Sequence, residues 1–211
     1  MTLAIGADAP DFALGDGGPG FHEWRSGRRT LVIAFKALSP TSTTESQVLW
    51  RLLEAFEARE TAMLGLCGDT AEDTGRWIGD LETLFGHGLP CRLVADPDLA
   101  IAGVFGIAAP DQPGGLQRAL LLVGPGGRLE FASAGPVTAG RNFHEILRLI
   151  DSIRLTASDR VATPADWRPG DPVLLPPSLP QAEAERRHGA GLRTIRPYLR
   201  YIPGARVSGA A

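Results

Sequence analysis

Two serines lie at S-x-x-S spacing in the stretch KALSPTSTTESQ, residues 36–47. Ser39 and Ser42 follow an apolar run typical of a strand and precede a pattern typical of a helix. The N-terminus of a helix favours an anion, so cysteines at these positions would indicate a redox site. A serine acts as a nucleophile only with a base within hydrogen-bond reach. The histidines lie scattered along the sequence, at His22, His87, His144 and His188.

Lys36 is the only lysine of the chain and lies directly after the apolar run. A lysine acts as a nucleophile or a proton donor where burial favours its neutral form. A lysine in a loop is more commonly solvated and contributes only its charge. Both roles stay open at this point, and Lys36 is kept as a candidate catalytic residue.

The two cysteines, Cys67 and Cys91, are far apart in the sequence and show neither C-x-x-C nor metal-ligand spacing. Cys67 follows one apolar run and Cys91 precedes another, positions where a small and inert buried thiol is common. This usage agrees with a reducing compartment. We therefore expect no redox role for either thiol, no bound metal and no cofactor.

The composition is that of an ordinary globular protein, with 44% hydrophobic and 21% charged residues in a chain of 211. A formal net charge of -3 offers no broad attraction to nucleic acid or to an anionic membrane. Small molecules and proteins are the expected partners. Residues 1–12 do not resemble a signal peptide, and no stretch reaches the roughly 18 apolar residues of a membrane span. We expect a cytoplasmic protein.

Short apolar runs alternate with amphipathic patterns along the first three quarters of the chain. Strands are expected at 30–35, 62–66, 92–95, 119–123 and 128–132. Helices are expected at 43–60, 71–85 and 141–153, where apolar residues recur at helical spacing. The glycine-rich VGPGG between the last two strands predicts a β-hairpin. This alternation predicts an α/β fold with helices on the faces of a sheet.

The amino-acid composition of the chain changes after residue 157. Residues 161–180 contain six prolines, which disfavour a regular helix or a central strand. We expect an extended arm in this part of the chain. The arm ends in a segment, 181–207, whose apolar and aromatic residues need a surface to pack on.

Five motifs follow one another in order along the chain. They are IGADAPDFAL (5–14), STTE (42–45), VADPDLAIAGVFGI (94–107), LQRALLLVGPGGRLEFA (116–132) and the run from TAGRNFHEILRL to VATPADWRPGDPV (138–173). Together they resemble the peroxiredoxin family, in its one-cysteine type with a C-terminal extension. The resemblance implies a thioredoxin-like fold, a central mixed sheet with flanking helices, in residues 1–157. It also implies a dimerisation arm in residues 158–211 and a homodimer or higher homo-oligomer.

Members of this family reduce hydroperoxides with a cysteine thiolate in the motif P-x-x-x-T-x-x-C, which becomes a sulfenic acid. The resemblance places Ser42 at the cysteine and Ser39 at the threonine that positions the peroxide. It matches Glu45 to the carboxylate of the active-site helix, and Arg118 and Arg141 to the two stabilising arginines. The predicted catalytic residues are Ser42, Ser39, Arg118 and Lys36. The predicted substrate-binding residues are Glu45 and Arg141.

The loop before Ser42 departs from the family as well. AFKALSPTS (34–42) is about one residue shorter than the usual loop and lacks the leading proline of the motif and the histidine before it. A single laboratory substitution would leave these features intact, so we favour natural loss of thiol peroxidase activity. The pocket would then bind a small molecule or catalyse a non-redox reaction, for instance in biosynthesis.

Two alternatives to this hypothesis stay open. One is a one-cysteine hydroperoxide reductase studied as an inactive Cys→Ser variant. The other is a non-catalytic protein with a chaperone or binding role. A phospholipase activity is not favoured, because Ser26 in HEWRSGRRT lacks the G-x-S-x-G pattern that exposes a nucleophilic serine.

Overall fold

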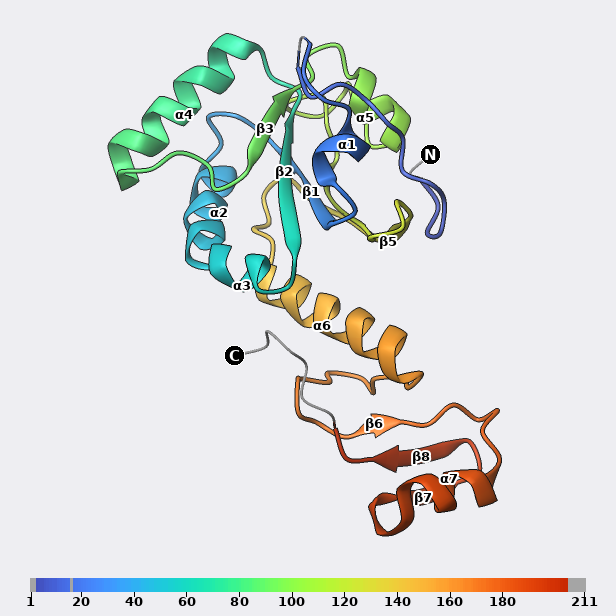
Figure 1. Cartoon of the computed structure of the whole chain (residues 1–211). Helices are drawn as coiled ribbons and strands as arrows, with labels where there is room; N and C mark the ends of the chain where they lie inside the picture. The colour runs from blue at the N-terminus through green and yellow to red at the C-terminus, as the bar shows by residue number, and fades with distance from the viewer. Residues whose placement is uncertain (1–2, 16, 205–211) are drawn as a thin grey trace. The chain divides into compact units, whose positions relative to one another are not determined.

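The computed structural model describes residues 3–15 and 17–204. The chain divides into two compact units, Met1–Arg141 and Asn142–Ala211, which we call the sheet unit and the C-terminal unit. Figure 1 shows a sheet with helices on its faces in the first, and a long helix and a small sheet in the second. Within the described ranges, no helix is both long and apolar enough to cross a membrane.

The sheet unit contains a mixed sheet with the strand order β3-β2-β1-β4-β5. The strands are β1 (Arg29–Phe35), β2 (Thr61–Cys67), β3 (Arg92–Ala95), β4 (Arg118–Val123) and β5 (Leu129–Gly135). The first three run parallel, whereas β4 pairs antiparallel with both β1 and β5. All five predicted strands and the predicted hairpin are confirmed, and so is the α/β fold with a central mixed sheet.

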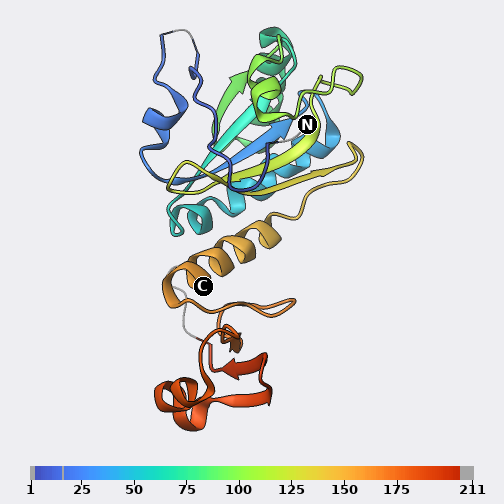
Figure 2. The same cartoon turned by 90° about the vertical axis from the view of Figure 1, so that its right-hand side faces the viewer.

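Helices cover both faces of this sheet. They are α1 (Phe21–Arg25), α2 (Pro40–Arg51), α3 (Leu53–Glu57), α4 (Ala71–Phe85) and α5 (Ala100–Phe105). In Figure 1, α2 and α4 lie on one side of the sheet and α1 and α5 on the other, and Figure 2 shows the same unit turned by 90°. The sequence pattern predicted neither α1 nor α5, since five or six residues are too few to show a helical period.

Strands β1 and β2 are buried along their whole length, as their continuous apolar runs predict. Successive side chains of a strand point to opposite faces, so β1 contributes to two cores. On one face, Val32 and Ala34 pack in a cluster with Phe21 of α1 and Phe105 of α5. On the other face, Phe35 contacts the ring of Trp77 on α4, with 5.6 Å between the ring centroids. The end of β1 is therefore held firmly on both sides.

Helix α2 begins at Pro40, three residues before the predicted start. Proline suits the first helical position, because its missing N–H would have no partner there. The prediction of one continuous helix over 43–60 is wrong, since the backbone leaves the helical conformation at Leu52 (φ -101°, ψ 3°) and α3 follows separately. Helix α4 has the predicted bounds, and the side chain of Thr70 caps its start by accepting a hydrogen bond from the Asp73 N–H.

The C-terminal unit begins with a long helix. Its elements are α6 (Phe143–Asp159), β6 (Val173–Leu174), α7 (Gln181–His188), a 3-10 turn η1 (Gly189–Gly191), β7 (Arg193–Arg196) and β8 (Leu199–Ile202). Helix α6 extends six residues beyond the predicted end at residue 153. The Asn142 side chain caps its start by accepting hydrogen bonds from the N–H groups of His144 and Glu145.

The proline-rich segment 161–180 contains only the two-residue strand β6, at the edge of a sheet with the order β6-β8-β7. Within the C-terminal unit, the indole of Trp167 packs with Leu155 and Val173. The helix α7 and the hairpin of β7 and β8 were not predicted. The boundary proposed at residue 157 stays a prediction.

Alanine substitutions at two glycines can test how tightly the loop before β4 packs against the end of β2. A Cβ at Gly68, just after β2, would lie 2.2 Å from the carbonyl oxygen of Gly114, whereas a Cβ at Gly75 on α4 would meet nothing within 4 Å. We expect Gly68→Ala to lower the free energy of unfolding by about 1–3 kcal/mol through overpacking. Gly75→Ala is the matched control and should raise it by up to about 1 kcal/mol.

Both variants are measured by urea denaturation. Equal stability of the two would show that the loop around Gly114 moves away without penalty.

Candidate functional site

Helix α2 carries the predicted hydroxyls and carboxylate at three-residue spacing, which places Ser39, Ser42 and Glu45 on one side of its first turns. Ser39 is the N-cap residue in an extended conformation, and its hydroxyl lies 2.9 Å from that of Thr41. Ser42 is fully buried, and its Oγ accepts a hydrogen bond of 3.2 Å from the backbone N–H of Lys36. Position 42 thus holds a neutral, buried hydroxyl tied to the preceding loop.

Glu45 is the centre of a buried ionic cluster. Its carboxylate accepts hydrogen bonds from Arg118 Nη2, from Arg141 Nη2 at 2.6 Å, and from the Arg141 backbone N–H at 2.7 Å. Arg141 Nη1 donates in addition to the carbonyl oxygens of Ala34 and Ala119, each at 2.9 Å. Helix α2, strands β1 and β4 and the segment that ends at Arg141 are therefore joined at one point.

The cluster carries one more positive than negative charge, since two guanidinium groups surround one carboxylate. Burial lowers the pKa of Arg141, and the hydrogen bonds and charge of Glu45 oppose this effect. Arg118 uses Nη2 for Glu45 and Nε for the carbonyl of Ala139 at 2.9 Å. Its remaining nitrogen, Nη1, makes no hydrogen bond to any described residue. One cationic donor of the cluster is thus left for another partner.

Lys36 is held by an acidic residue that sequence reasoning missed. Its ammonium forms an ion pair with Asp69, whose side chain is 7% exposed and also accepts a hydrogen bond of 2.8 Å from the backbone N–H of Ala37. Phe35 and Cys67 are paired at the ends of parallel β1 and β2, so the residues after them meet at the same edge of the sheet. That topology was the available signal for Asp69. This ion pair engages the Lys36 side chain, and its catalytic role stays a prediction.

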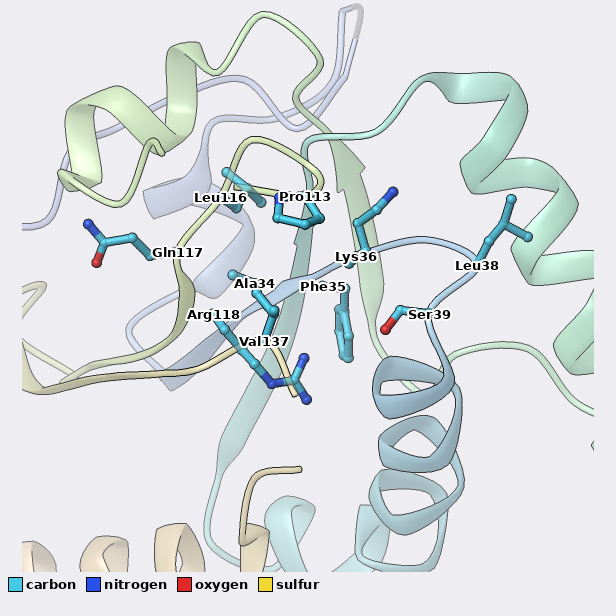
Figure 3. A pocket seen from close by; sticks show the side chains of 10 residues that line it. All are labelled: Ala34, Phe35, Lys36, Leu38, Ser39, Pro113, Leu116, Gln117, Arg118 and Val137. Atoms are coloured by element: carbon cyan, nitrogen blue, oxygen red, sulfur yellow. The ribbon is translucent and has the colours of Figure 1, made fainter. Parts of the chain in front are cut away.

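A pocket of about 240 Å³ lies at the end of β1 and beside the start of α2 (Figure 3). Its lining consists of Ala34, Phe35, Lys36, Leu38, Ser39, Pro113, Leu116, Gln117, Arg118 and Val137. Figure 3 shows the Arg118 guanidinium and the Ser39 hydroxyl on the same side of the pocket, with the Phe35 ring between them. The Lys36 ammonium points away from both.

The structure thus separates the six predicted site residues into two groups. Lys36, Ser39 and Arg118 line the pocket. Ser42, Glu45 and Arg141 lie outside this lining, Ser42 in full burial and the other two in the ionic cluster. The apolar part of the lining comes from the end of β1, from Leu38, and from the loops before β4 and after β5, and the sequence motifs did not predict this combination.

Neither cysteine is placed for redox chemistry. Cys67 is fully buried and donates to Asp69 Oδ2 at 3.2 Å, and burial raises the pKa of its thiol. Burial raises the pKa of Cys91 to about 12. A thiol with a raised pKa contains little thiolate near neutral pH and is a poor nucleophile. Among residues 3–15 and 17–204, no group of His, Cys, Asp and Glu side chains is arranged to hold a metal ion.

The motifs and the fold match known proteins. A family model described as the AhpC/TSA family matches residues 5–132, and one described as the C-terminal domain of 1-Cys peroxiredoxin matches residues 152–189. The chain belongs to the AhpC/TSA family. It is 34% identical to peroxiredoxin-6 of Gallus gallus, over 95% of this chain and 97% of the relative. It is 32% identical to the 1-Cys peroxiredoxin of Dirofilaria immitis, over 92% of each.

Solved peroxiredoxin structures confirm the thioredoxin-like fold. A yeast mitochondrial 1-Cys peroxiredoxin is similar with a TM-score of 0.85 at 28% identity, over 96% of this chain and 100% of that chain. A Cys→Ser mutant of the peroxiredoxin 6 of Arenicola marina is similar with a TM-score of 0.85 at 32% identity, over 96% of this chain and 99% of that one. The family and fold expected from the motifs are therefore both confirmed.

We expect Glu45→Gln to destabilise the sheet unit strongly. The amide removes the charge that balances two buried guanidinium groups, and loss of one partner in a buried ion pair typically costs about 3–5 kcal/mol. Glu57→Gln, an exposed position on α3, is the control and should change stability by less than about 0.5 kcal/mol. Urea denaturation of both variants measures the difference. Equal stability would contradict the central role assigned to Glu45.

Both thiols of the native protein should react slowly with a disulfide reagent at pH 8. With a pKa of about 12, Cys91 holds far less thiolate than an ordinary cysteine, by about a thousandfold. The raised pKa favours the folded state below about pH 9, and this contribution is lost between about pH 9 and 12. The same chain unfolded in guanidinium chloride is the control. A native thiol that reacts as fast as in the unfolded chain would contradict the assignment of both cysteines as inert.

Proposed function

We propose that this member of the AhpC/TSA family lacks thiol peroxidase activity and uses its pocket to bind a small anion, for storage, sensing or non-redox catalysis. The observation that supports the proposal is the pairing of a neutral, buried hydroxyl at position 42 with an available Arg118 nitrogen beside the pocket. Peroxide reduction needs a thiolate that attacks the peroxide oxygen and becomes a sulfenic acid. A serine oxygen has no such oxidised state, and the two cysteines are inert.

The charge of the site supports anion binding. In the chemistry of the family, a thiolate at this helix N-terminus supplies a negative charge next to the arginines. With Ser42 at this helix N-terminus, there is no thiolate to offset the positive charge of Arg118 and Arg141 around Glu45. An anion that reaches Arg118 gains free energy from a charge-assisted hydrogen bond.

The main alternative is a one-cysteine hydroperoxide reductase that carries an inactivating Cys→Ser change. Similarity to 1-Cys peroxiredoxins over nearly the whole chain fits this alternative equally well. The loop favours natural divergence, because Lys36 and Ser42 have partners of their own within the altered segment and its surroundings. The encoding gene separates the two, since a cysteine codon at position 42 supports the alternative.

A purely structural role, with the pocket as a relic, is less well supported. A pocket that has lost its use is free to fill with side chains, whereas this one keeps about 240 Å³ beside a buried arginine. We further propose a homodimer that assembles through residues 158–211 in the cytoplasm, without affinity for nucleic acid. Light scattering of the full chain measures the mass of the assembly.

We expect no catalytic consumption of hydrogen peroxide by the protein in the presence of dithiothreitol. Ser42→Cys should introduce turnover, because a thiol there lies in the first turn of α2, on the same side as Glu45 and its arginines. Ser46→Cys is the matched control, since Ser46 is equally buried one turn further along α2, and it should stay inactive. Turnover by the unmodified protein at a rate similar to Ser42→Cys would overturn the proposed loss of function.

A further inference from the structure

The pocket combines one cationic donor with mainly apolar walls. Six of its ten lining residues are apolar: Ala34, Phe35, Leu38, Pro113, Leu116 and Val137. The cationic donor is Arg118, whose side chain is 5% exposed and whose Nη1 has no hydrogen-bond partner in the part of the chain that the structure describes. Such a site favours a ligand with one polar end and an apolar body.

The charge of the ligand follows from the groups around the pocket. Arg118 belongs to a cluster with a formal charge of +1, and Lys36 is neutralised by Asp69. One excess positive charge is balanced by one negative charge, so a doubly charged phosphate or sulfate would bring a buried charge without a partner. A monocarboxylate fits this charge, and one of its oxygens can accept a charge-assisted hydrogen bond from Arg118 Nη1.

The apolar part of the lining reaches the outside of the protein. Leu38 is 43% exposed and Val137 is 37% exposed, both unusually high for large hydrophobic side chains beside a pocket. Leu38 also has a left-handed backbone (φ 53°), which a leucine rarely adopts and which persists only where the surroundings enforce it. The hydrogen bond from the Ala37 N–H to Asp69 holds the preceding residue in place. The loop is thus fixed with an apolar side chain at the mouth of the pocket.

The volume limits the size of the ligand. A space of about 240 Å³ is many times the roughly 10–15 Å³ that one water molecule needs, so a ligand larger than a few atoms is required to fill it. Acetate would leave most of the apolar wall uncovered, and a long acyl chain would extend into solvent. A carboxylate on a ring or a short branched chain fills the space.

We propose that the ligand of this pocket is a compact monocarboxylate with an apolar or aromatic body, its carboxylate on Arg118 Nη1 and its body against Phe35, Leu116 and Val137. This inference rests on the proposed function, because it requires that position 42 contributes no anion. It goes further by naming the chemical class. The Ser39 hydroxyl lies on the same side as Arg118, but it is hydrogen-bonded to Thr41, so Arg118 is the main donor for the carboxylate.

The test is a calorimetric titration of the full chain with sodium benzoate, benzamide, acetate and sulfate at constant ionic strength. We expect benzoate to bind at least about tenfold more tightly than benzamide, which lacks the charge, and than acetate, which lacks the ring. Equal affinity for benzoate and acetate, or for sulfate, would overturn the class of ligand and leave the proposed anion site intact. Binding of none of these anions would overturn both proposals, and equal binding of benzamide would overturn the role of Arg118.

Three variants assign the contacts. Arg118→Lys keeps a charge beside Glu45 but removes the Nη1 donor, and should weaken benzoate binding about tenfold with the fold retained by circular dichroism. Val137→Thr replaces a methyl group by a hydroxyl at the pocket and should weaken it about fivefold. Val104→Thr, an exposed valine on α5 outside the lining, is the matched control and should have no effect. If Val137→Thr and Val104→Thr bind benzoate equally, the apolar body does not contact the pocket wall and the proposal fails, even if Arg118→Lys does not fold.

Discussion

The carboxylate of Glu45 joins the parts of the sheet unit that form the site. It contacts Arg118 on β4 and Arg141, while Arg141 in turn donates to the carbonyl oxygen of Ala34 on β1. Each of these groups is buried, and a buried charge is costly unless it is paired and hydrogen-bonded. The positions of α2, β1 and β4 are therefore linked, and the pocket beside Arg118 takes its shape from an ionic contact that does not itself line it.

This arrangement separates two tasks that the family combines. The arginines and the helix N-terminus stabilise negative charge, and a cysteine supplies the nucleophile. Here the first part is retained through Glu45, while Ser42 is a hydroxyl that accepts a hydrogen bond from the Lys36 N–H. Because the cluster also joins α2, β1 and β4, its contribution to stability is a sufficient reason for both arginines to be present. The presence of both arginines is thus no sign of peroxidase activity in this chain.

The sequence predicted the sheet well, because β1, β2 and β4 are continuous apolar runs whose burial leaves little alternative. Family motifs located Ser39, Ser42, Glu45 and both arginines, but not their division between a pocket and a structural cluster. That division depends on which nitrogens of Arg118 already donate hydrogen bonds within the protein, and the sequence does not reveal this side-chain geometry. Asp69 was missed because its role arises only when β1 and β2 lie side by side and bring it to Lys36.

The altered loop indicates why Ser42 alone does not define the site. Asp69 fixes Lys36 and Ala37, the backbone at Leu38 is left-handed, and the Leu38 side chain lies at the mouth of the pocket. A Ser42→Cys change introduces a thiol but leaves this loop as it is. The proposed carboxylate would place its apolar body against the apolar rim that the loop provides. The residues around position 42, more than the residue at 42 itself, set which molecules reach Arg118.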